Sequence, residues 1–214
     1  MALELPRLSP ILDSESLDRR GISLPAAAAA FLQGGAGILQ LRHKAHWSRA
    51  VFECAREVAL MCRESGAPFI VNDRADFALL LDAGLHVGQD DLLPRDARRL
   101  MGTDAVIGFS SHNVPQLCAA GGEPVDYVAL GPVFGTASKR DPDPVVGVGE
   151  VRRCRALLEK PLVAIGGITV ENALEVLAAG ADSLAVISGL LPEPATPRSL
   201  RERMEEWQRL LRTV

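Results

Sequence analysis

Two short acidic motifs stand directly after apolar runs of the sequence. Asn72-Asp73-Arg74 follows one run, and Gln89-Asp90-Asp91 follows the next. Proteins typically hold Mg²⁺ with one or two carboxylates, while waters and substrate phosphate complete the octahedron. Asp73 and Asp91 are therefore candidate Mg²⁺ ligands. The alternative is helix capping, because a helix could begin just after each carboxylate.

Three cations form a second group of candidates. Arg42 and Lys44 follow one apolar run, and Lys139 lies in a long segment between Gly131 and Gly147. A pyrophosphate group leaves only when its charge is neutralised, and Arg and Lys side chains can do this. Solvated surface is the alternative for any single cation. A segment of this length in a compact domain is often a lid, which favours a functional Lys139.

Glycines follow the last two apolar runs. The strings are Ala164-Ile165-Gly166-Gly167-Ile168 and Ala185-Val186-Ile187-Ser188-Gly189. Glycine lets backbone N–H groups approach an anion closely. These strings predict a phosphate site, with tight turns that bind nothing as the alternative.

The histidines are weaker candidates. Ser111-His112 and His43 could suggest a general base, but no acid and nucleophile accompany them in the sequence. His86 lies inside an apolar run, where packing could satisfy it. We therefore favour structural roles for all three.

Short apolar runs alternate with helical patterns along the whole chain. The expected strands are continuous runs, as in parallel strands buried on both faces: 8–12, 37–41, 68–71, 85–87, 106–109, 127–130, 162–165 and 183–187. The clearest expected helices are 24–33, 49–64, 172–179 with Thr169 as N-cap and Gly180 after its end, and about 199–211. Eight such units in 214 residues predict one α/β domain, a (β/α)₈ TIM barrel over residues 1–214. All the candidate residues then lie at the C-terminal ends of strands, where barrel active sites occur.

Composition excludes several classes of partner. The net charge is −4 and aromatic residues make up 4% of the chain, so neither a basic face nor stacking platforms for nucleic acid are expected. No apolar run approaches the roughly 18 residues of a membrane span, and the first residues lack a secretory pattern. The four cysteines form no CxxC or Cys/His cluster. We expect a cytoplasmic protein with reduced thiols.

Taken together, the motifs resemble the thiamine phosphate synthase family over essentially the whole chain. The strings that carry the resemblance are QLRHK at 40–44, VNDRADFAL at 71–79, GLHVGQDD at 84–91, GFSSH at 108–112, DYVALGPVFGTASK at 126–139, PLVAIGGIT at 161–169 and AGADSLAVIS at 179–188. The family joins 4-amino-2-methyl-5-hydroxymethylpyrimidine diphosphate to hydroxyethylthiazole phosphate, giving thiamine phosphate and pyrophosphate.

The resemblance implies a role for each motif residue. Gln40, Arg42, Lys44 and Asn72 would bind the pyrimidine diphosphate, Ser110 and Lys139 its pyrophosphate, Asp73 and Asp91 would ligate Mg²⁺, Thr136 and Ser138 would contact the thiazole phosphate, and the backbones of Gly167, Ile187 and Ser188 would hold its phosphate group. Arg42, Lys44, Ser110 and Lys139 would be the catalytic set, acting by positioning and electrostatics without a side-chain nucleophile. A homodimer is also implied.

Two alternatives remain. A thiazole tautomerase of the same superfamily shares the barrel and the glycine-lined phosphate site, and His112 would be its key residue. A non-catalytic phosphate-binding barrel is the other alternative, since a fold alone does not fix a function. Asp73, Asp91, Lys44 and Lys139 favour the synthase over both.

Overall fold

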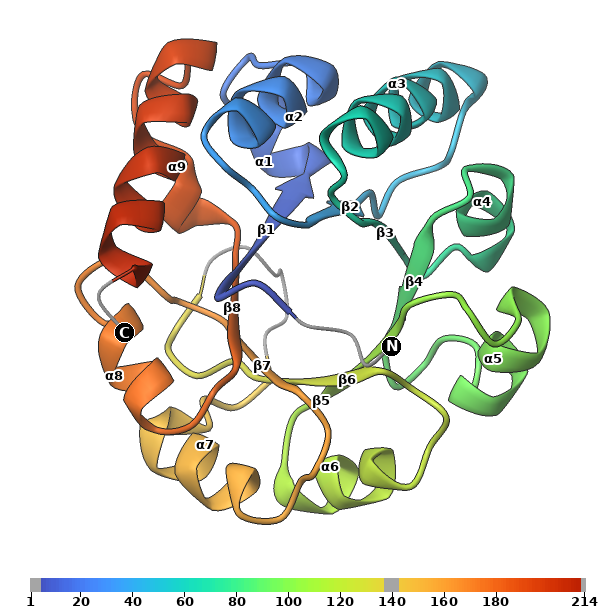
Figure 1. Ribbon diagram of the computed structural model, residues 1–214, viewed down its shortest axis with the longest axis vertical. Coiled ribbons are helices and arrows are strands. Elements are labelled where there is room, and N and C mark those ends of the chain that lie inside the picture. The colour runs from blue at the N-terminus through green and yellow to red at the C-terminus, as the bar shows by residue number, and fades with distance from the viewer. Residues whose placement is uncertain (1–4, 137–142, 213–214) are drawn as a thin grey trace.

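The computed structural model describes residues 5–136 and 143–212, and in it eight parallel strands form a closed barrel surrounded by helices (Figure 1). The strands follow one another around the barrel in sequence order, and β8 pairs with β1 to close it. The predicted (β/α)₈ barrel is confirmed. The C-terminal ends of all strands therefore face one rim.

The elements have these bounds in chain order: β1 Leu8–Asp13, α1 Ser14–Asp18, α2 Leu24–Gln33, β2 Leu39–Arg42, α3 Arg49–Ser65, β3 Phe69–Asn72, α4 Ala75–Leu80, β4 Gly84–Val87, α5 Pro94–Met101, β5 Ile107–Ser111, α6 Val114–Gly121, β6 Tyr127–Leu130, α7 Gly147–Arg155, β7 Leu162–Ile165, α8 Ala173–Ala178, β8 Ser183–Val186, the 3₁₀ turn η1 Ser188–Leu190 and α9 Pro197–Leu211. Each strand begins and ends within two residues of its predicted range. None of the described helices is both long and apolar enough to cross a membrane.

The predicted cap of α8 is wrong. Thr169 does not cap it, because a turn at 169–172 comes first and the helix begins only at Ala173. The Asn172 side chain holds this turn: its Oδ1 accepts from the Thr169 N–H at 2.9 Å, and its Nδ2 donates to the Gly167 carbonyl at 3.0 Å. The same amide thus fixes the glycine-rich end of β7.

Helix α9 begins two residues before its predicted start. Thr196 and Ser199 form a reciprocal capping box, and Pro197 occupies the first turn, where its missing N–H costs nothing. On the inner face of the helix, Trp207 is fully buried and donates to the Gly189 carbonyl at 3.1 Å. Because Gly189 follows β8, α9 anchors the chain at the end of that strand.

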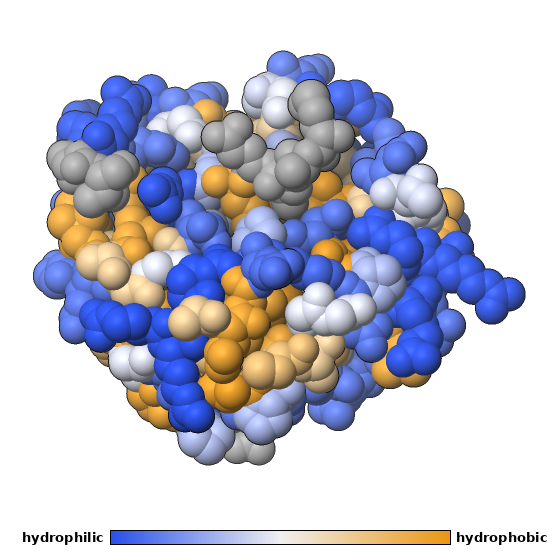
Figure 2. All heavy atoms as spheres, turned by 60° about the horizontal axis from the view of Figure 1, so that its bottom comes forward, coloured by the Kyte–Doolittle hydropathy of each residue, from blue (hydrophilic) through white to orange (hydrophobic). Residues whose placement is uncertain are grey.

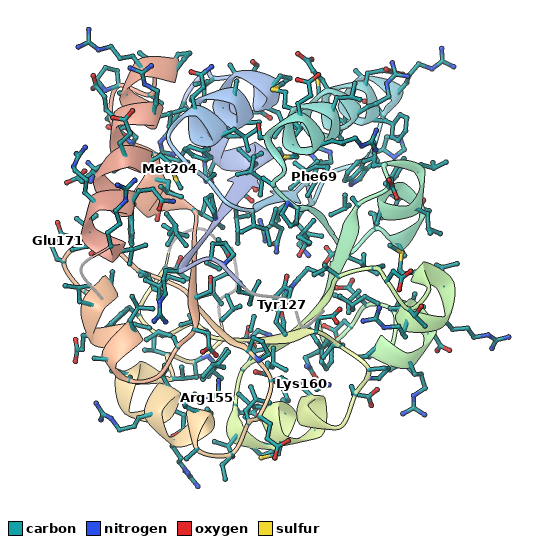
Figure 3. The ribbon with its side chains drawn as sticks, in the orientation of Figure 1. Phe69, Tyr127, Arg155, Lys160, Glu171 and Met204 are labelled. Atoms are coloured by element: carbon teal, nitrogen blue, oxygen red, sulfur yellow. The ribbon has the colours of Figure 1, made fainter. Side chains whose placement is uncertain are left out.

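The apolar core has two parts. The larger part lies between the strands and the helices, and includes Phe69 and Met204 (Figure 3). The smaller part consists of Ile11, Tyr127, Ala129, Val163 and Ala185, and Figure 3 shows Tyr127 reaching from β6 into the middle of the barrel. On the face shown in Figure 2, hydrophobic residues reach the surface in a strip between wide hydrophilic areas. Side chains from these strands occupy most of the barrel interior, as is usual for this fold.

Two aspartates tie strands to helices at the N-terminal end of the barrel. Asp126 Oδ2 accepts from the Ile107 N–H and from Arg98 Nη2, both at 2.7 Å. Asp182 Oδ2 accepts from the Leu162 N–H at 2.8 Å and from Arg155 Nη1 at 2.7 Å. Asp126 lies just before β6 and holds β5 and α5, and Asp182 lies just before β8 and holds β7 and α7. Both lie at the opposite end of the barrel from the C-terminal rim.

We expect Asp126→Ala to lower the free energy of unfolding by about 2 kcal/mol, because a buried strand N–H and a guanidinium both lose a charged acceptor. Urea unfolding measures this loss, and kcat/KM should stay within a factor of about two because the residue lies at the opposite end from the rim. The control is Asp104→Ala, an exposed carboxylate in the same region. Equal losses for both variants would contradict the assigned role of Asp126.

Candidate active site at the C-terminal rim

A cavity of about 500 Å³ opens at the C-terminal rim of the barrel. Its lining contains every predicted site residue that the structure describes: Gln40, Arg42, Lys44, Asn72, Asp73, Asp91, Ser110, Thr136, Gly167, Ile187 and Ser188. The other two predicted residues, Ser138 and Lys139, lie outside the described residues. Residues from all parts of the sequence thus meet in one space large enough for a small ligand.

Asp73 and Asp91 lie side by side in this cavity. Asp73 has a left-handed backbone with φ 66°, and its N–H donates to the His86 carbonyl at 2.8 Å, which fixes the turn after β3. Asp91 Oδ2 accepts from the Gly88 N–H at 2.7 Å, which fixes the turn after β4. Two separate turns therefore hold the two carboxylates together.

The two carboxylates carry an electrostatic conflict. Burial raises the pKa of Asp73, the Lys44 ammonium opposes that rise, and a hydrogen bond with the Asp91 carboxyl adds to it. Two neighbouring carboxylates disfavour each other's ionisation unless a cation compensates. The oxygen donors and the excess negative charge fit a hard divalent cation. Among the described residues no group of three or more His, Cys, Asp or Glu side chains could hold a metal ion, so further ligands would have to come from substrate or water.

The capping alternative for these aspartates is wrong. Helix α4 has Arg74 at its N-cap and α5 has Leu93, and neither helix start receives a side-chain capping bond. Asp73 instead accepts from Lys44 Nζ at 2.5 Å. Both carboxylates are thus oriented by the rim and not by the helices that follow.

The cations Lys44 and Arg42 have different partners. Lys44 is half-exposed and pairs with Asp73, whereas Arg42 is mostly buried and donates through Nη1 to Asp13 Oδ2 at 2.5 Å. Asp13 is 3% exposed and also caps α1 by accepting from the Ser16 N–H at 3.0 Å. Asp13 thereby fixes the plane of the guanidinium at the end of β2. Asp13 was not among the residues predicted for the site, although its position at the end of the first strand is a usable signal.

The glycines after β7 have backbone conformations that other residues rarely adopt. Gly166 and Gly167 have φ values of 102° and 63°. A Cβ at Gly167 would lie 2.4 Å from the Gly135 carbonyl oxygen, so the chain after β6 packs directly on this turn. A Cβ at Gly189 would lie 2.8 Å from the Ile168 carbonyl oxygen, so the ends of β7 and β8 also touch. Bare backbone from two strand ends borders the cavity here, as in barrel phosphate sites.

His86 lies directly beneath the cavity and uses both ring nitrogens. Nδ1 lies 2.9 Å from the Tyr127 hydroxyl, and Nε2 lies 2.8 Å from Ser110 Oγ. Burial lowers the pKa of His86 to about 4. The imidazole is therefore neutral at ordinary pH, and it connects one predicted site residue, Ser110, to the barrel interior.

Comparison with known proteins agrees with this geometry. Residues 8–190 match the sequence pattern of the family described as thiamine monophosphate synthase. The chain belongs to this family. A thiamine-phosphate synthase of Koribacter versatilis is 43% identical over 212 residues, covering 98% of this chain and 97% of that protein. One from Methanoregula boonei is 46% identical over 175 residues, covering 80% and 81%.

A solved structure within the thiamine monophosphate synthase family shares the fold closely. The thiamine phosphate pyrophosphorylase of Pyrococcus furiosus superposes with a TM-score of 0.83 at 29% identity, covering 97% of this chain and 96% of that one. The shared architecture thus extends over nearly the whole barrel, including the rim that carries the candidate site.

His112 is held by the backbone in this member of the thiamine monophosphate synthase family. Its Nδ1 lies 2.7 Å from the Gly131 carbonyl oxygen, its N–H donates to Gln116 Oε1 at 2.8 Å, and Asp143 lies 3.4 Å from Nδ1. His112 lines the cavity, but these contacts orient the turn after β5. The structural role favoured for His112 from the sequence stays a prediction.

Lowering the pH from about 7 to about 5 should cost this family member about 2 kcal/mol of unfolding free energy through His86 alone. The pKa of His86 falls from 6.5 to about 4 on folding, so the unfolded chain binds the proton first as the pH drops. The stability is present above about pH 6.5 and is lost towards pH 4. Asp73, with its raised pKa, contributes in the opposite direction. Thermal or urea unfolding against pH measures the sum.

Comparing two histidine variants shows how much of the pH dependence of stability comes from His86. His86→Asn should flatten the pH dependence of stability, whereas the exposed His46→Asn should retain it. An unchanged slope in His86→Asn would show that His86 is not the group responsible.

Proposed function

We propose that the chain joins 4-amino-2-methyl-5-hydroxymethylpyrimidine diphosphate to hydroxyethylthiazole phosphate, releasing pyrophosphate. With the carboxylated form of the thiazole, the carboxyl group would also leave as CO₂. The observation that carries this proposal is that one cavity has two unlike ends, each with groups suited to an anion. Asp73 and Asp91 with Lys44 and Arg42 border one end. Bare backbone at the ends of β7 and β8 borders the other. A substrate that loses a diphosphate and a substrate that keeps a monophosphate need two such ends.

In this proposal Asp73 and Asp91 hold Mg²⁺, which neutralises diphosphate charge when bound. Lys44, Arg42, Ser110 and Lys139 bind the departing pyrophosphate, and Gln40 and Asn72 hold the pyrimidine. Gly167, Ile187 and Ser188 hold the thiazole phosphate, and Thr136 and Ser138 contact that substrate. The close carboxylate pair with its raised Asp73 pKa supports the metal assignment.

The proposed reaction needs no side-chain nucleophile. The C–O bond to the diphosphate breaks, its electron pair leaves with pyrophosphate, and the pyrimidinylmethyl cation is stabilised by its ring amino group. The thiazole nitrogen then forms the new C–N bond. The cations lower the barrier by stabilising the leaving group, and the two ends of the cavity lower it by alignment.

One assay tests the function. Purified protein is incubated with both phosphorylated substrates, with and without Mg²⁺, and thiamine phosphate and pyrophosphate are quantified. Formation of both in a one-to-one ratio only with Mg²⁺ is the expected result. Isomerisation of a thiazole carboxylate tautomer that His112→Ala abolishes would instead favour the tautomerase, and binding without turnover a non-catalytic barrel.

We also propose that the chain acts as a homodimer in the cytoplasm. Large leucines are exposed on neighbouring parts of the barrel wall: Leu79 and Leu80 on α4, and Leu92 and Leu93 before α5. Exposed apolar groups of this kind favour association. All four cysteines are unpaired, which suits a reducing compartment. Sedimentation velocity of the wild type and of Leu80→Lys tests the dimer, since a monomeric wild type would exclude it.

A further inference from the structure

A chain of polar side chains crosses the barrel beneath the cavity and links two predicted substrate-binding residues. Ser110 from β5 contacts His86 from β4, His86 contacts Tyr127 from β6, and the Tyr127 hydroxyl is hydrogen-bonded to the side chain of Gln40 from β2. His86 and Tyr127 are 6% and 4% exposed; Gln40, His86 and Ser110 line the cavity, whereas Tyr127 does not. Figure 3 shows Tyr127 pointing into the barrel centre, where this relay passes. We call these four residues the relay.

The barrel makes specific room for the relay. A Cβ at Gly108 would lie 2.4 Å from the Tyr127 hydroxyl and 2.5 Å from His86 Nδ1, so only glycine fits between the two rings. The rings stack with centroids 5.5 Å apart and an interplanar angle of 28°. Gly108 on β5 therefore leaves the space that the contact between His86 and Tyr127 requires.

The hydrogen bonds of the relay can be arranged in two ways, which differ in which group of each pair donates the proton. A neutral imidazole has one donor and one acceptor nitrogen. If Nδ1 carries the proton, it donates to the Tyr127 oxygen, and Nε2 accepts from the Ser110 hydroxyl. If Nε2 carries the proton, it donates to Ser110 Oγ, and Nδ1 accepts from the Tyr127 hydroxyl. Whether Ser110 donates to His86 or accepts from it therefore decides whether Tyr127 accepts from His86 or donates to it.

An oxyanion in the cavity selects one direction. Pyrophosphate oxygens only accept hydrogen bonds, so Ser110 must donate its proton to them and accept from His86 Nε2. Tyr127 must then donate to Nδ1, and the Tyr127 oxygen must accept from the amide nitrogen of Gln40. This leaves Gln40 Oε1 free to accept from a donor in the cavity.

We propose that His86 and Tyr127 are positioning residues that couple recognition of the leaving pyrophosphate by Ser110 to recognition of the pyrimidine amino group by Gln40. This inference rests on the proposed function, because it takes both ligand groups from that substrate. The close fit of Gly108 between the His86 and Tyr127 rings supports it independently of the ligand. The enzyme would then favour one molecule that carries both groups over separate amine and phosphate ligands.

The tautomer of His86 tests the direction without any turnover. Protein labelled with ¹⁵N-histidine is titrated with inorganic pyrophosphate and Mg²⁺, and long-range ¹H–¹⁵N correlation identifies which nitrogen carries the proton. His86→Asn assigns the signal. We expect the proton on Nε2 with pyrophosphate bound. A proton on Nδ1 in that complex would overturn the proposal.

Kinetics test the coupling. Tyr127→Phe keeps the ring and removes the hydroxyl, and we expect the KM for the pyrimidine diphosphate to rise about tenfold while the KM for the thiazole phosphate stays within about twofold. The matched control is Ser9→Ala, which removes another hydrogen bond inside the barrel, the 2.8 Å contact with Ser183, and should change neither KM. Equal changes in both KM values for Tyr127→Phe would mean a merely structural role and would overturn the proposal.

The outcomes separate this inference from the proposed function. If the wild type makes no thiamine phosphate, the proposed function fails whatever the tautomer. If it does and His86 carries its proton on Nδ1, the function stands and the relay fails. The tautomer measurement uses the unaltered protein, so it decides the matter even where Tyr127→Phe does not fold.

Discussion

Asp73→Asn is expected to lower kcat/KM for thiamine phosphate formation by about a thousandfold, or about 4 kcal/mol of transition-state stabilisation. Asparagine keeps the shape of the side chain but removes the charge that, with Asp91, would hold Mg²⁺. The Mg²⁺ concentration for half-maximal rate should rise at least about tenfold. Steady-state rates measured over a Mg²⁺ titration give both quantities.

Stability should respond in the opposite direction to activity. Asp73 is partly buried beside Asp91, and this burial raises its pKa, so the fold disfavours its charged form. Its ion pair with the half-exposed Lys44 compensates little, because exposed pairs are worth about 0–1 kcal/mol. The melting temperature of Asp73→Asn should therefore equal or exceed that of the wild type. A loss of both activity and stability would point to a structural role.

The matched control is Asp76→Asn. Asp76 lies three residues away in the first turn of α4, is exposed and pairs with Arg74 at 2.5 Å. Its removal should leave the rate and the Mg²⁺ requirement within a factor of about two, since exposed pairs away from a site contribute little. If Asp73→Asn shows the same Mg²⁺ dependence as this control, the metal assignment is wrong.

Strand periodicity and the position of each polar residue after its strand were enough to predict which side chains meet at the rim of the barrel. In a closed parallel barrel every strand end faces the same rim, so Asp73 after β3 and Asp91 after β4 had to approach each other. Glycines after β7 predicted bare backbone at the rim in the same way. The prediction worked because it depended only on where each strand ends.

Features that depend on which way a strand residue points could not be predicted. The strands are short and continuously apolar, so no alternation marked Gln40, His86, Ser110 and Tyr127 as facing the barrel interior. His86 was expected to be satisfied by packing, whereas hydrogen bonds on both nitrogens satisfy it. Tyr127 on β6 contacts His86 on β4 and Gln40 on β2, so its contacts pass over neighbouring strands. Only the register of the closed barrel brings them together.

Gly167→Ala is expected to raise the KM for the thiazole phosphate about a hundredfold by displacing the backbone that would hold its phosphate, a loss of about 3 kcal/mol. The alanine Cβ would lie 2.4 Å from the Gly135 carbonyl oxygen and 2.7 Å from Phe134 Cβ. Because the first of these atoms is backbone, it cannot rotate away. The left-handed φ of 63° adds strain of about 1 kcal/mol. The KM for the pyrimidine diphosphate should change much less, because the described residues assigned to that substrate lie on or directly after β2 to β5.

Gly149→Ala is the control, because a Cβ at Gly149 has open space around it. Gly149 lies in the first turn of α7, and nothing lies within 4 Å of a Cβ built there. Alanine should raise the free energy of unfolding by up to about 1 kcal/mol through its helix propensity and leave both KM values unchanged. Direct titration with inorganic phosphate should show weakened binding in Gly167→Ala but not in Gly149→Ala. If both variants bind phosphate as the wild type does, the anion site lies elsewhere than at the end of β7. In that case groups other than the backbone of Gly166 and Gly167 would hold the phosphate of the thiazole substrate.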